Sequence, residues 1–280
     1  MEGIRKTIEG LEVSDKSKGV YKSLANRVAK HKMKIPLKKQ EKVDYVSQFL
    51  NENFEKDSTK LDLLNLIIVL RHADELETTK LKELRATIQK SRVNGNIDKM
   101  TKKGKDLLTL EQFNEKLDES LKDKHYKKYI VNWLWSHFCV RNEDVNVYIV
   151  KSIKETNEDD TKNYLVIQGN KIRYIRNKYK TIKAYGKKTH TITDKEFVSA
   201  VKKQGEGRLL GETTQIGNAL RRLTIDKMGE ADVCKMVIDH YYDNADTEKI
   251  NEMASSRGTS IGVIKSFYNI NAEQDIIREI

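Results

Sequence analysis

The order in which hydrophobic patterns change along the chain is the feature that most constrains its fold. Residues 145–193 contain the β-branched and aromatic runs VNVYIVKSI, NYLVIQ, KIRYIRNKYKT and KKTHTIT, separated by the turn-like ETNEDD, GN and AYG. Such runs predict strands, and the short turns between them predict a small antiparallel sheet. Apolar residues recur at helical spacing before this block and again after it. This element order predicts a mostly helical α+β fold.

The first 40 residues are strongly basic. Between Lys16 and Lys42 there are ten Lys or Arg and one acid, Glu41. We expect residues 1–40 to form a basic arm, mobile or helical, with a plain solvated segment as the alternative.

Two further parts follow. Residues 41–100 contain three helical patterns and predict an all-helical domain, whose third helix ends near VNGN. The stretch MTKKGKD looks like a basic linker to a second domain at 107–280. The first helix of that domain is expected to begin with Thr109 and Gln112 spaced as a capping box.

The charge balance points to a polyanionic partner. The 280 residues include 53 Lys or Arg and 42 Asp or Glu, a net charge of +11. Nucleic acid is the expected partner rather than a membrane surface, because the sequence has no long apolar run. The alternative is that a lysine-rich surface only keeps the protein in solution.

Other function classes find little support. Cys139 and Cys234 fit no metal spacing, and the sequence has no HExxH, P-loop or GxGxxG motif. We therefore expect no metal, no cofactor and no small-molecule substrate. The start of the chain, MEGIRKTIEG, lacks the apolar core of a signal peptide, and two isolated cysteines suit a reduced, intracellular protein.

The most basic segment coincides with a predicted hairpin. From Lys171 to Lys188 there are eight Lys or Arg and no acid, interleaved with tyrosines. On a strand, Arg176, Lys178 and Lys180 would share one face, which suits binding to phosphates. The alternative is a strand edge guarded by lysines against aggregation.

Two other cations occupy positions of interest. Arg141 follows an apolar helix, and Asp144, three residues later, could orient it as a fork for an anion; the alternative is a surface salt bridge. Lys235 lies one step off the apolar stripe of the predicted helix ADVCKMVIDHYY and could lie at the edge of that stripe. The alternative interpretation is an ordinary lysine in contact with solvent.

These residues, together with the C-terminal stretch RGTSIGVIKSFYNI, resemble the tyrosine recombinase (integrase) family over about residues 107–270. The resemblance implies that the helical domain at 41–100 takes the place of the family's DNA-contacting core-binding domain. The resemblance implies a catalytic arginine with a nearby acid, a general-acid lysine on the hairpin, a second phosphate-binding cation, a hydrogen-bond donor in a Gly-Thr-Ser turn, and a tyrosine nucleophile. The matching positions are Arg141, Asp144, Lys180, Lys235, Thr259 and Tyr268.

The sequence departs from the family pattern in its catalytic set. Lys235 stands where the family has its second arginine, Asp232 where it has a histidine, and Thr259 where it has the histidine of a Gly-His-Ser turn. Lysine keeps the charge but loses the planar fork, and threonine is no acid or base near neutral pH. Arg221 or Arg222 is an alternative second arginine.

The resemblance implies a DNA-binding protein that cleaves and rejoins DNA through a 3′-phosphotyrosyl link. A catalytically silent relative that binds DNA structurally is the main alternative, and a lysine-rich interaction protein without nucleic acid is another. Double-stranded DNA is the implied partner, with self-association on it. The expected DNA-contacting residues are Arg173, Arg176, Lys178, Lys183, Lys187 and Lys188.

Two expectations concern place and geometry. The implied setting is intracellular, at DNA in the cytoplasm or nucleus, and the Lys-, Asn- and Ile-rich composition suits an AT-rich genome such as that of a virus or mobile element.

A helix from Ile261 should bury Ile261 and Ile264 and bring the Tyr268 hydroxyl into one basic pocket with Arg141, Lys180 and Lys235.

Overall fold

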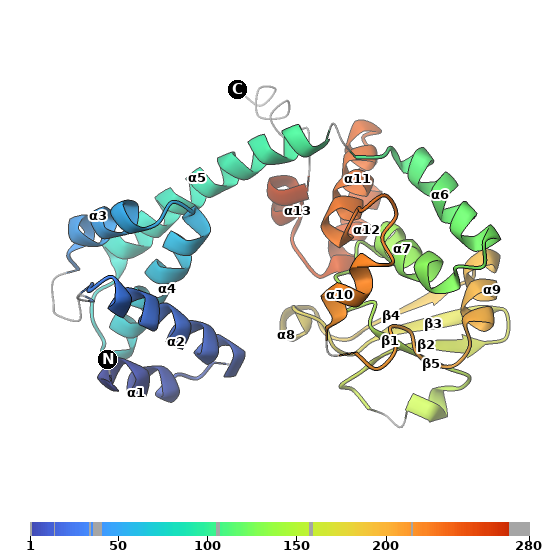
Figure 1. The fold of residues 1–280 in the computed structure, drawn as a ribbon, viewed down its shortest axis with the longest axis horizontal. Helices are drawn as coiled ribbons and strands as arrows, with labels where there is room; N and C mark the ends of the chain where they lie inside the picture. The colour runs from blue at the N-terminus through green and yellow to red at the C-terminus, as the bar shows by residue number, and fades with distance from the viewer. Residues whose placement is uncertain are drawn as a thin grey trace. The chain divides into compact units, whose positions relative to one another are not determined.

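The two parts of the chain each have a hydrophobic core of their own. The computed structural model divides into the units Met1–Asn96 and Ile97–Ile280 (Figure 1). The residues it describes are 2–13, 15–33, 35, 41–104, 107–156, 159–213 and 215–268.

The first unit is built from helices. They are α1 (Glu2–Gly10), α2 (Asp15–Lys30), α3 (Val43–Asn53), α4 (Asp57–Ala73) and α5 (Thr79–Gly104). The central one is α4, which buries Leu63, Leu64, Leu66 and Ile67 completely. A helix that is apolar around most of its circumference belongs inside a bundle, and the other helices of the unit pack around it.

Two expectations for this half need correction. The described residues of 1–40 do not form a separate arm, because α1 and α2 pack into the core through Ile8, Leu24, Ala25 and Val28. The helical spacing of the last three buries one face of α2 and leaves Arg27 and Lys30 exposed. Pro36 lies outside the described residues.

The third helix does not end near VNGN either, because α5 continues to Gly104. Glycine and asparagine lower helix propensity by about 1 kcal/mol or less each, which a long helix can absorb. The first part of the expected linker MTKKGKD is therefore helical, and residues 105–106 lie outside the described part of the chain.

The second unit begins with α6 (Leu110–Lys122) and α7 (Tyr126–Phe138). The predicted capping box is confirmed, because the Thr109 hydroxyl accepts from the Gln112 N–H and the Gln112 side chain accepts from the Thr109 N–H. The sheet strands are β1 (Val147–Val150), β2 (Asn163–Gln168), β3 (Lys171–Arg176), β4 (Lys188–Ile192) and β5 (Gly207–Arg208), with the 3-10 helix η1 (Ile153–Thr156) after β1. The remaining helices are α8 (Ile182–Tyr185), α9 (Lys195–Gln204), α10 (Ile216–Arg221), α11 (Glu230–Asp243), α12 (Thr247–Arg257) and α13 (Ile261–Tyr268). The predicted α+β class is confirmed.

The sheet is mixed, which corrects the expectation of a purely antiparallel one. Its strand order is β4-β3-β2-β1-β5. The pairs β2–β3, β3–β4 and β1–β5 are antiparallel, whereas β1 and β2 run parallel, from Val147 opposite Asn163 to Val150 opposite Val166. Residues 151–162 form a connection long enough to return the chain to the start of the sheet, as a parallel pair requires.

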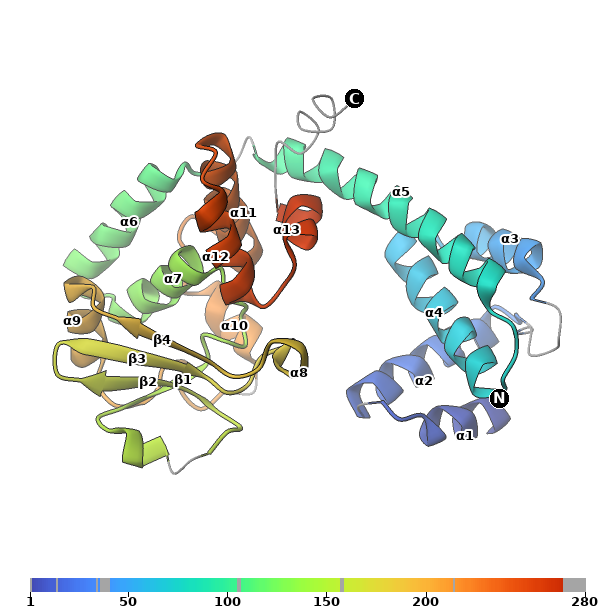
Figure 2. The same ribbon diagram turned by 180° about the vertical axis from the view of Figure 1, so that it is seen from behind.

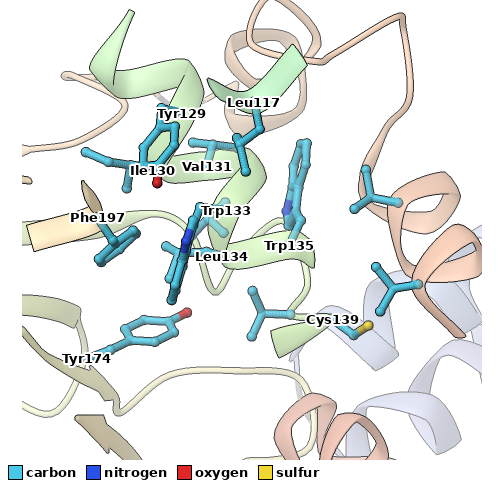
Figure 3. Close-up of a cluster of buried hydrophobic side chains, with 14 of the residues drawn as sticks. Leu117, Tyr129, Ile130, Val131, Trp133, Leu134, Trp135, Cys139, Tyr174 and Phe197 are labelled. Atoms are coloured by element: carbon cyan, nitrogen blue, oxygen red, sulfur yellow. The ribbon is translucent and has the colours of Figure 1, made fainter. Parts of the chain in front are cut away.

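The core of the second unit centres on α7. Every residue of α7 from Tyr129 to Ser136 is buried. Figure 3 shows Trp133 beside Phe197 from α9 and Tyr174 from β3, and the ring centres of Trp133 and Phe197 lie 4.2 Å apart. In the two views of the ribbon, α6, α7, α11 and α12 lie on one side of the sheet (Figures 1 and 2). This packing fixes the C-terminal end of α7, from which the chain continues to Arg141.

Within the described part of the chain, none of the helices combines the length and the hydrophobicity needed to cross a bilayer.

Candidate active site

The first arginine of the site lies just after α7. Cys139 ends this helix in a left-handed conformation, with φ of 47°, and turns the chain toward Arg141. The half-buried Arg141 donates from Nη1 to the main-chain oxygen of Arg257 at 2.7 Å. Burial, together with the positive charge of Arg257, lowers the pKa of Arg141 below its ordinary value.

Arg257 is the second arginine of this cluster, and the sequence reasoning missed it. It is the last residue of α12 and is only 4% exposed. Its Nη1 donates to the Cys139 oxygen at 2.5 Å, and its Nη2 forms an ion pair of 2.5 Å with Glu230 at the start of α11. The guanidinium therefore joins the ends of three helices, α7, α11 and α12.

The predicted nucleophile lies against this guanidinium. Arg257 Nη2 donates to the Tyr268 hydroxyl at 2.5 Å, and the guanidinium carbon lies 4.6 Å from the centre of the Tyr268 ring. Burial raises the pKa of Tyr268, while the charge of Arg257 opposes that shift. The Tyr268 hydroxyl is therefore hydrogen-bonded to a cationic side chain.

Helix α13 carries Tyr268 and is anchored at one point. Ile264 is completely buried, as expected, but Ile261 is 44% exposed, which corrects the expectation that both would be buried. Ile261 is the first residue of α13, which packs against α11 and α12.

The buried ion pair of the site joins Asp144 and Arg176, whose side chains are both 0% exposed. Arg176 Nη2 lies 2.5 Å from Asp144 Oδ2, and the same oxygen accepts from the Arg141 N–H at 3.1 Å. Burial raises the pKa of the Asp144 carboxyl, and the charge of Arg176 opposes the shift. Arg176 therefore does not face solvent to contact phosphates, and Asp144 binds the backbone of Arg141 while its carboxylate pairs with Arg176.

The predicted hairpin face is also different in the structure. Strand β3 ends at Arg176, so Lys178 and Lys180 are exposed in the connection that follows and do not continue the strand. The buried amide of Asn163 holds this connection, because its Oδ1 accepts from the Lys178 N–H at 2.8 Å and its Nδ2 donates to the Lys178 oxygen at 2.9 Å.

The same connection packs against the Gly258 turn. The Thr181 hydroxyl donates to the Gly258 oxygen at 2.7 Å. Gly258 has φ of 67°, and a Cβ there would lie 2.7 Å from Thr181 Oγ1 and 2.9 Å from Cε2 of Tyr179. Glycine is thus required by both its conformation and this close approach. Lys180 lies between the two contacting residues and is exposed.

Four further candidate residues can be located, and their roles stay predictions. Lys235 is half-buried on α11. Thr259 is half-buried after the turn, and its N–H donates to the Ala254 oxygen at 3.0 Å. The alternative arginines, Arg221 and Arg222, are exposed at the end of α10.

Most of the predicted DNA-contacting cations are on the surface. Arg173, Lys178, Lys183 and Lys187 are exposed, and Lys187 pairs with Asp160 at 3.3 Å. Lys188 is half-buried, with its ammonium 5.8 Å from the centre of the Tyr185 ring.

The described residues offer no cluster of three or more His, Cys, Asp or Glu that could hold a metal ion. Cys139 and Cys234 are free and buried. A hydrogen bond with Cys234, together with burial, raises the pKa of the Cys139 thiol.

No protein-family model and no curated protein sequence matches this chain. Among solved structures, a crystal structure of XerA recombinase superposes on 99% of this chain and 97% of its own, with 11% sequence identity and a TM-score of 0.38. At that TM-score the superposition carries no argument about what this chain does.

Proposed function

We propose that this protein binds DNA and that its second unit contains a phosphoryl-transfer site. More particularly, we infer a site of tyrosine-recombinase type in which Tyr268 is the nucleophile. The observation that carries the proposal is the 2.5 Å contact between the Tyr268 hydroxyl and Arg257, whose carbonyl is in turn bound by Arg141. A tyrosine oxygen beside two arginines suits attack on an anionic phosphodiester.

The reaction we propose needs no cofactor. The Tyr268 oxygen attacks the phosphorus of a DNA strand, and the bond from phosphorus to the 5′ oxygen breaks. Overall, the phenolic proton is lost and the freed 5′ oxygen gains a proton, for which the exposed Lys180 is the proposed donor. The products are a 3′-phosphotyrosyl link and a 5′-hydroxyl, and the reverse reaction rejoins the strand.

The two arginines have distinct proposed roles. Arg141 is half-buried and can direct its remaining donors to the non-bridging oxygens of the phosphate. Arg257 donates to the phenolic oxygen itself, so its charge favours the ionised form of Tyr268 as the new bond develops. Lys235 and Thr259 keep their predicted roles as a further cation and a hydrogen-bond donor.

The proposed partner is double-stranded DNA, and self-association on DNA remains part of the proposal. The exposed cations Arg173, Lys178, Lys183 and Lys187 would contact phosphates on either side of the reacting one. The proposed location of the protein is therefore at DNA, inside a cell.

A second candidate function is DNA binding without cleavage. It is favoured by the number of protein groups that already occupy Arg257: a carbonyl, a carboxylate and the phenol itself. It is also favoured by the raised pKa of Tyr268, which disfavours the ionised nucleophile.

A covalent-trapping experiment separates the candidates. The full chain is incubated with a pool of random-sequence duplexes carrying nicks, so that a cleaved short strand diffuses away and the protein stays attached, and a denaturing gel reveals the adduct. We expect an adduct with the wild type, none with Tyr268→Phe, and an unchanged amount with Tyr126→Phe, which removes a hydroxyl elsewhere in the same unit. Binding without any adduct would favour the second candidate, and a lack of DNA binding would contradict both.

A further inference from the structure

Arg176 is completely buried beside the proposed site, and its guanidinium contacts both the turn after Arg141 and the last residues of α12. Both its side chain and that of Asp144 are 0% exposed. Nη2 binds the Asp144 carboxylate, and Nη1 donates to the main-chain oxygen of Ser256. Ser256 directly precedes Arg257, and Asp144 is bonded to the N–H of Arg141 at 3.1 Å. One side chain thus connects the backbones that present the two arginines.

A third segment is tied to the same guanidinium. The guanidinium carbon of Arg176 lies 4.6 Å from the centre of the Tyr179 ring, and the Tyr179 hydroxyl donates to the Gly186 oxygen at 2.5 Å. The Tyr179 ring also closes over Gly258, where an added Cβ would lie 2.9 Å from it. Lys180 follows Tyr179 directly, so its backbone is held by the same packing.

Arginine is well suited to this position. Its planar fork can donate to a carboxylate and a carbonyl in fixed directions while its face stacks on an aromatic ring. A lysine has one ammonium group and no planar face, so it cannot make the three contacts together. Replacing a buried ion pair with apolar residues is often neutral or stabilising, so stability alone gives little reason for this pair.

We propose that Arg176, fixed by Asp144, is a positioning residue that sets the relative placement of the Arg141 turn, the Arg257–Gly258 turn and the Lys180 segment. This inference rests on the proposed function for its consequence in catalysis, but the placement itself can be measured without any reaction. Arg176 contacts no substrate in this scheme and acts only through the three segments.

The first measurement is amide hydrogen exchange on the full chain by mass spectrometry. Arg176→Met keeps the bulk of the side chain but removes its hydrogen bonds, and Arg176→Met with Asp144→Asn also leaves no unpaired buried charge. Lys202→Met, on the exposed face of α9, removes one cation outside the cluster and is the matched control. We expect faster exchange in peptides covering 140–146 and 255–260 in both Arg176 variants, with α6, α9 and the control unchanged.

The second measurement is the rate of covalent adduct formation. A displacement of about 1 Å among reacting groups lowers rates by roughly 100-fold, so we expect a loss of that order in Arg176→Met, with a partial return in Arg176→Lys and unchanged affinity for duplex DNA. Two results would overturn the positioning role. One is wild-type exchange rates in the peptides 140–146 and 255–260, and the other is faster exchange throughout the second unit of the double variant. If the exchange pattern is as expected but the wild type forms no adduct, the positioning role stands and the proposed function fails.

Discussion

The Arg141 guanidinium donates to the main-chain oxygen of Arg257 at 2.7 Å, although 116 residues separate the two along the chain. In the opposite direction, Arg257 Nη1 donates to the main-chain oxygen of Cys139, two residues before Arg141. These reciprocal bonds join the end of α7 to the end of α12. They bring a predicted catalytic arginine next to one that the sequence reasoning did not single out, and Tyr268 is bonded to the latter.

The ion pair of Arg257 gives the first prediction. Arg257→Met would leave the Glu230 carboxylate, whose side chain is 14% exposed, without its partner. Removing one member of a buried pair costs about 3–5 kcal/mol, so we expect a loss of this order in the free energy of unfolding from urea titrations. Adding Glu230→Gln should recover part of the loss, and Lys202→Met should cause none. A single variant as stable as the wild type would show that the pair does not form.

Gly258 allows conformational strain to be separated from close contact. Gly258 and Gly169 both have positive φ, at 67° and 62°, but a Cβ at Gly169 would meet nothing within 4 Å. We expect Gly169→Ala to cost about 1–2 kcal/mol from the left-handed conformation alone. Gly258→Ala should cost about 1–3 kcal/mol more, because it also presses on Thr181 and Tyr179. Equal losses in thermal or urea unfolding would contradict the packing of the 179–181 segment on the turn.

The exposed cations predict a salt dependence for DNA binding. If Lys178 and Lys183 each neutralise a phosphate, changing each to Ala should reduce the slope of log affinity against log salt by about 0.9. Arg176→Met should leave the slope unchanged, since the Arg176 side chain is completely buried. Fluorescence anisotropy with a labelled duplex at several salt concentrations measures these slopes. If the slope changes for Arg176→Met but not for the two lysine variants, Lys178 and Lys183 do not contact DNA and Arg176 does.

His190 predicts a loss of stability in acid. Burial first, and then the charges of Arg176 and Lys188, lower the pKa of His190 to about 4. Its ordinary pKa is about 6.5, so between these values the unfolded chain binds more protons and stability falls as the pH falls. His190→Phe, whose ring can keep the tilted contact with Phe138 at 4.6 Å between ring centres, should lose less stability than the wild type between pH 7 and pH 4.5. If urea titrations show the wild type and His190→Phe losing the same free energy of unfolding between pH 7 and pH 4.5, this environment for His190 would be contradicted.

The separate cores predict the behaviour of a fragment. The core residues that the structure describes in the second unit lie between Leu107 and Tyr268, so a chain of residues 107–280 keeps them together. We expect the fragment to unfold cooperatively but to bind duplex DNA more weakly than the full chain, because two linked binding surfaces raise each other's effective concentration. Equal affinity would show that the first unit takes no part in binding.

The features that were predicted correctly from the sequence depend on residues only a few positions apart. The Thr109–Gln112 capping box depends on residues three apart, and the burial of Ile264 follows from the apolar side of a short helix. The strands could be located because β-branched runs alternate with turn residues over a few positions. The parallel pairing of β1 with β2 could not, because it depends on the path of the intervening connection.

The errors at the site arose from distant partners. Arg176 is on a basic segment and was expected to face solvent, yet Asp144, 32 residues away, pairs with it in the interior. Arg257 lies in the polar stretch SSRGTS, and its burial depends on Glu230 and on the end of α7. Its place directly before the Gly-Thr-Ser turn was the one local signal that could have identified it.

The most direct test of the central claim is to identify the residue that carries trapped DNA. After covalent trapping with nicked duplexes, the protein is digested with protease and nuclease, and the modified peptide is sequenced by mass spectrometry. We predict one nucleotide joined through its 3′ phosphate to Tyr268, with the modification absent from Tyr268→Phe and strongly reduced in Arg141→Met. DNA joined to any other residue, or through a 5′ phosphate, would contradict the account.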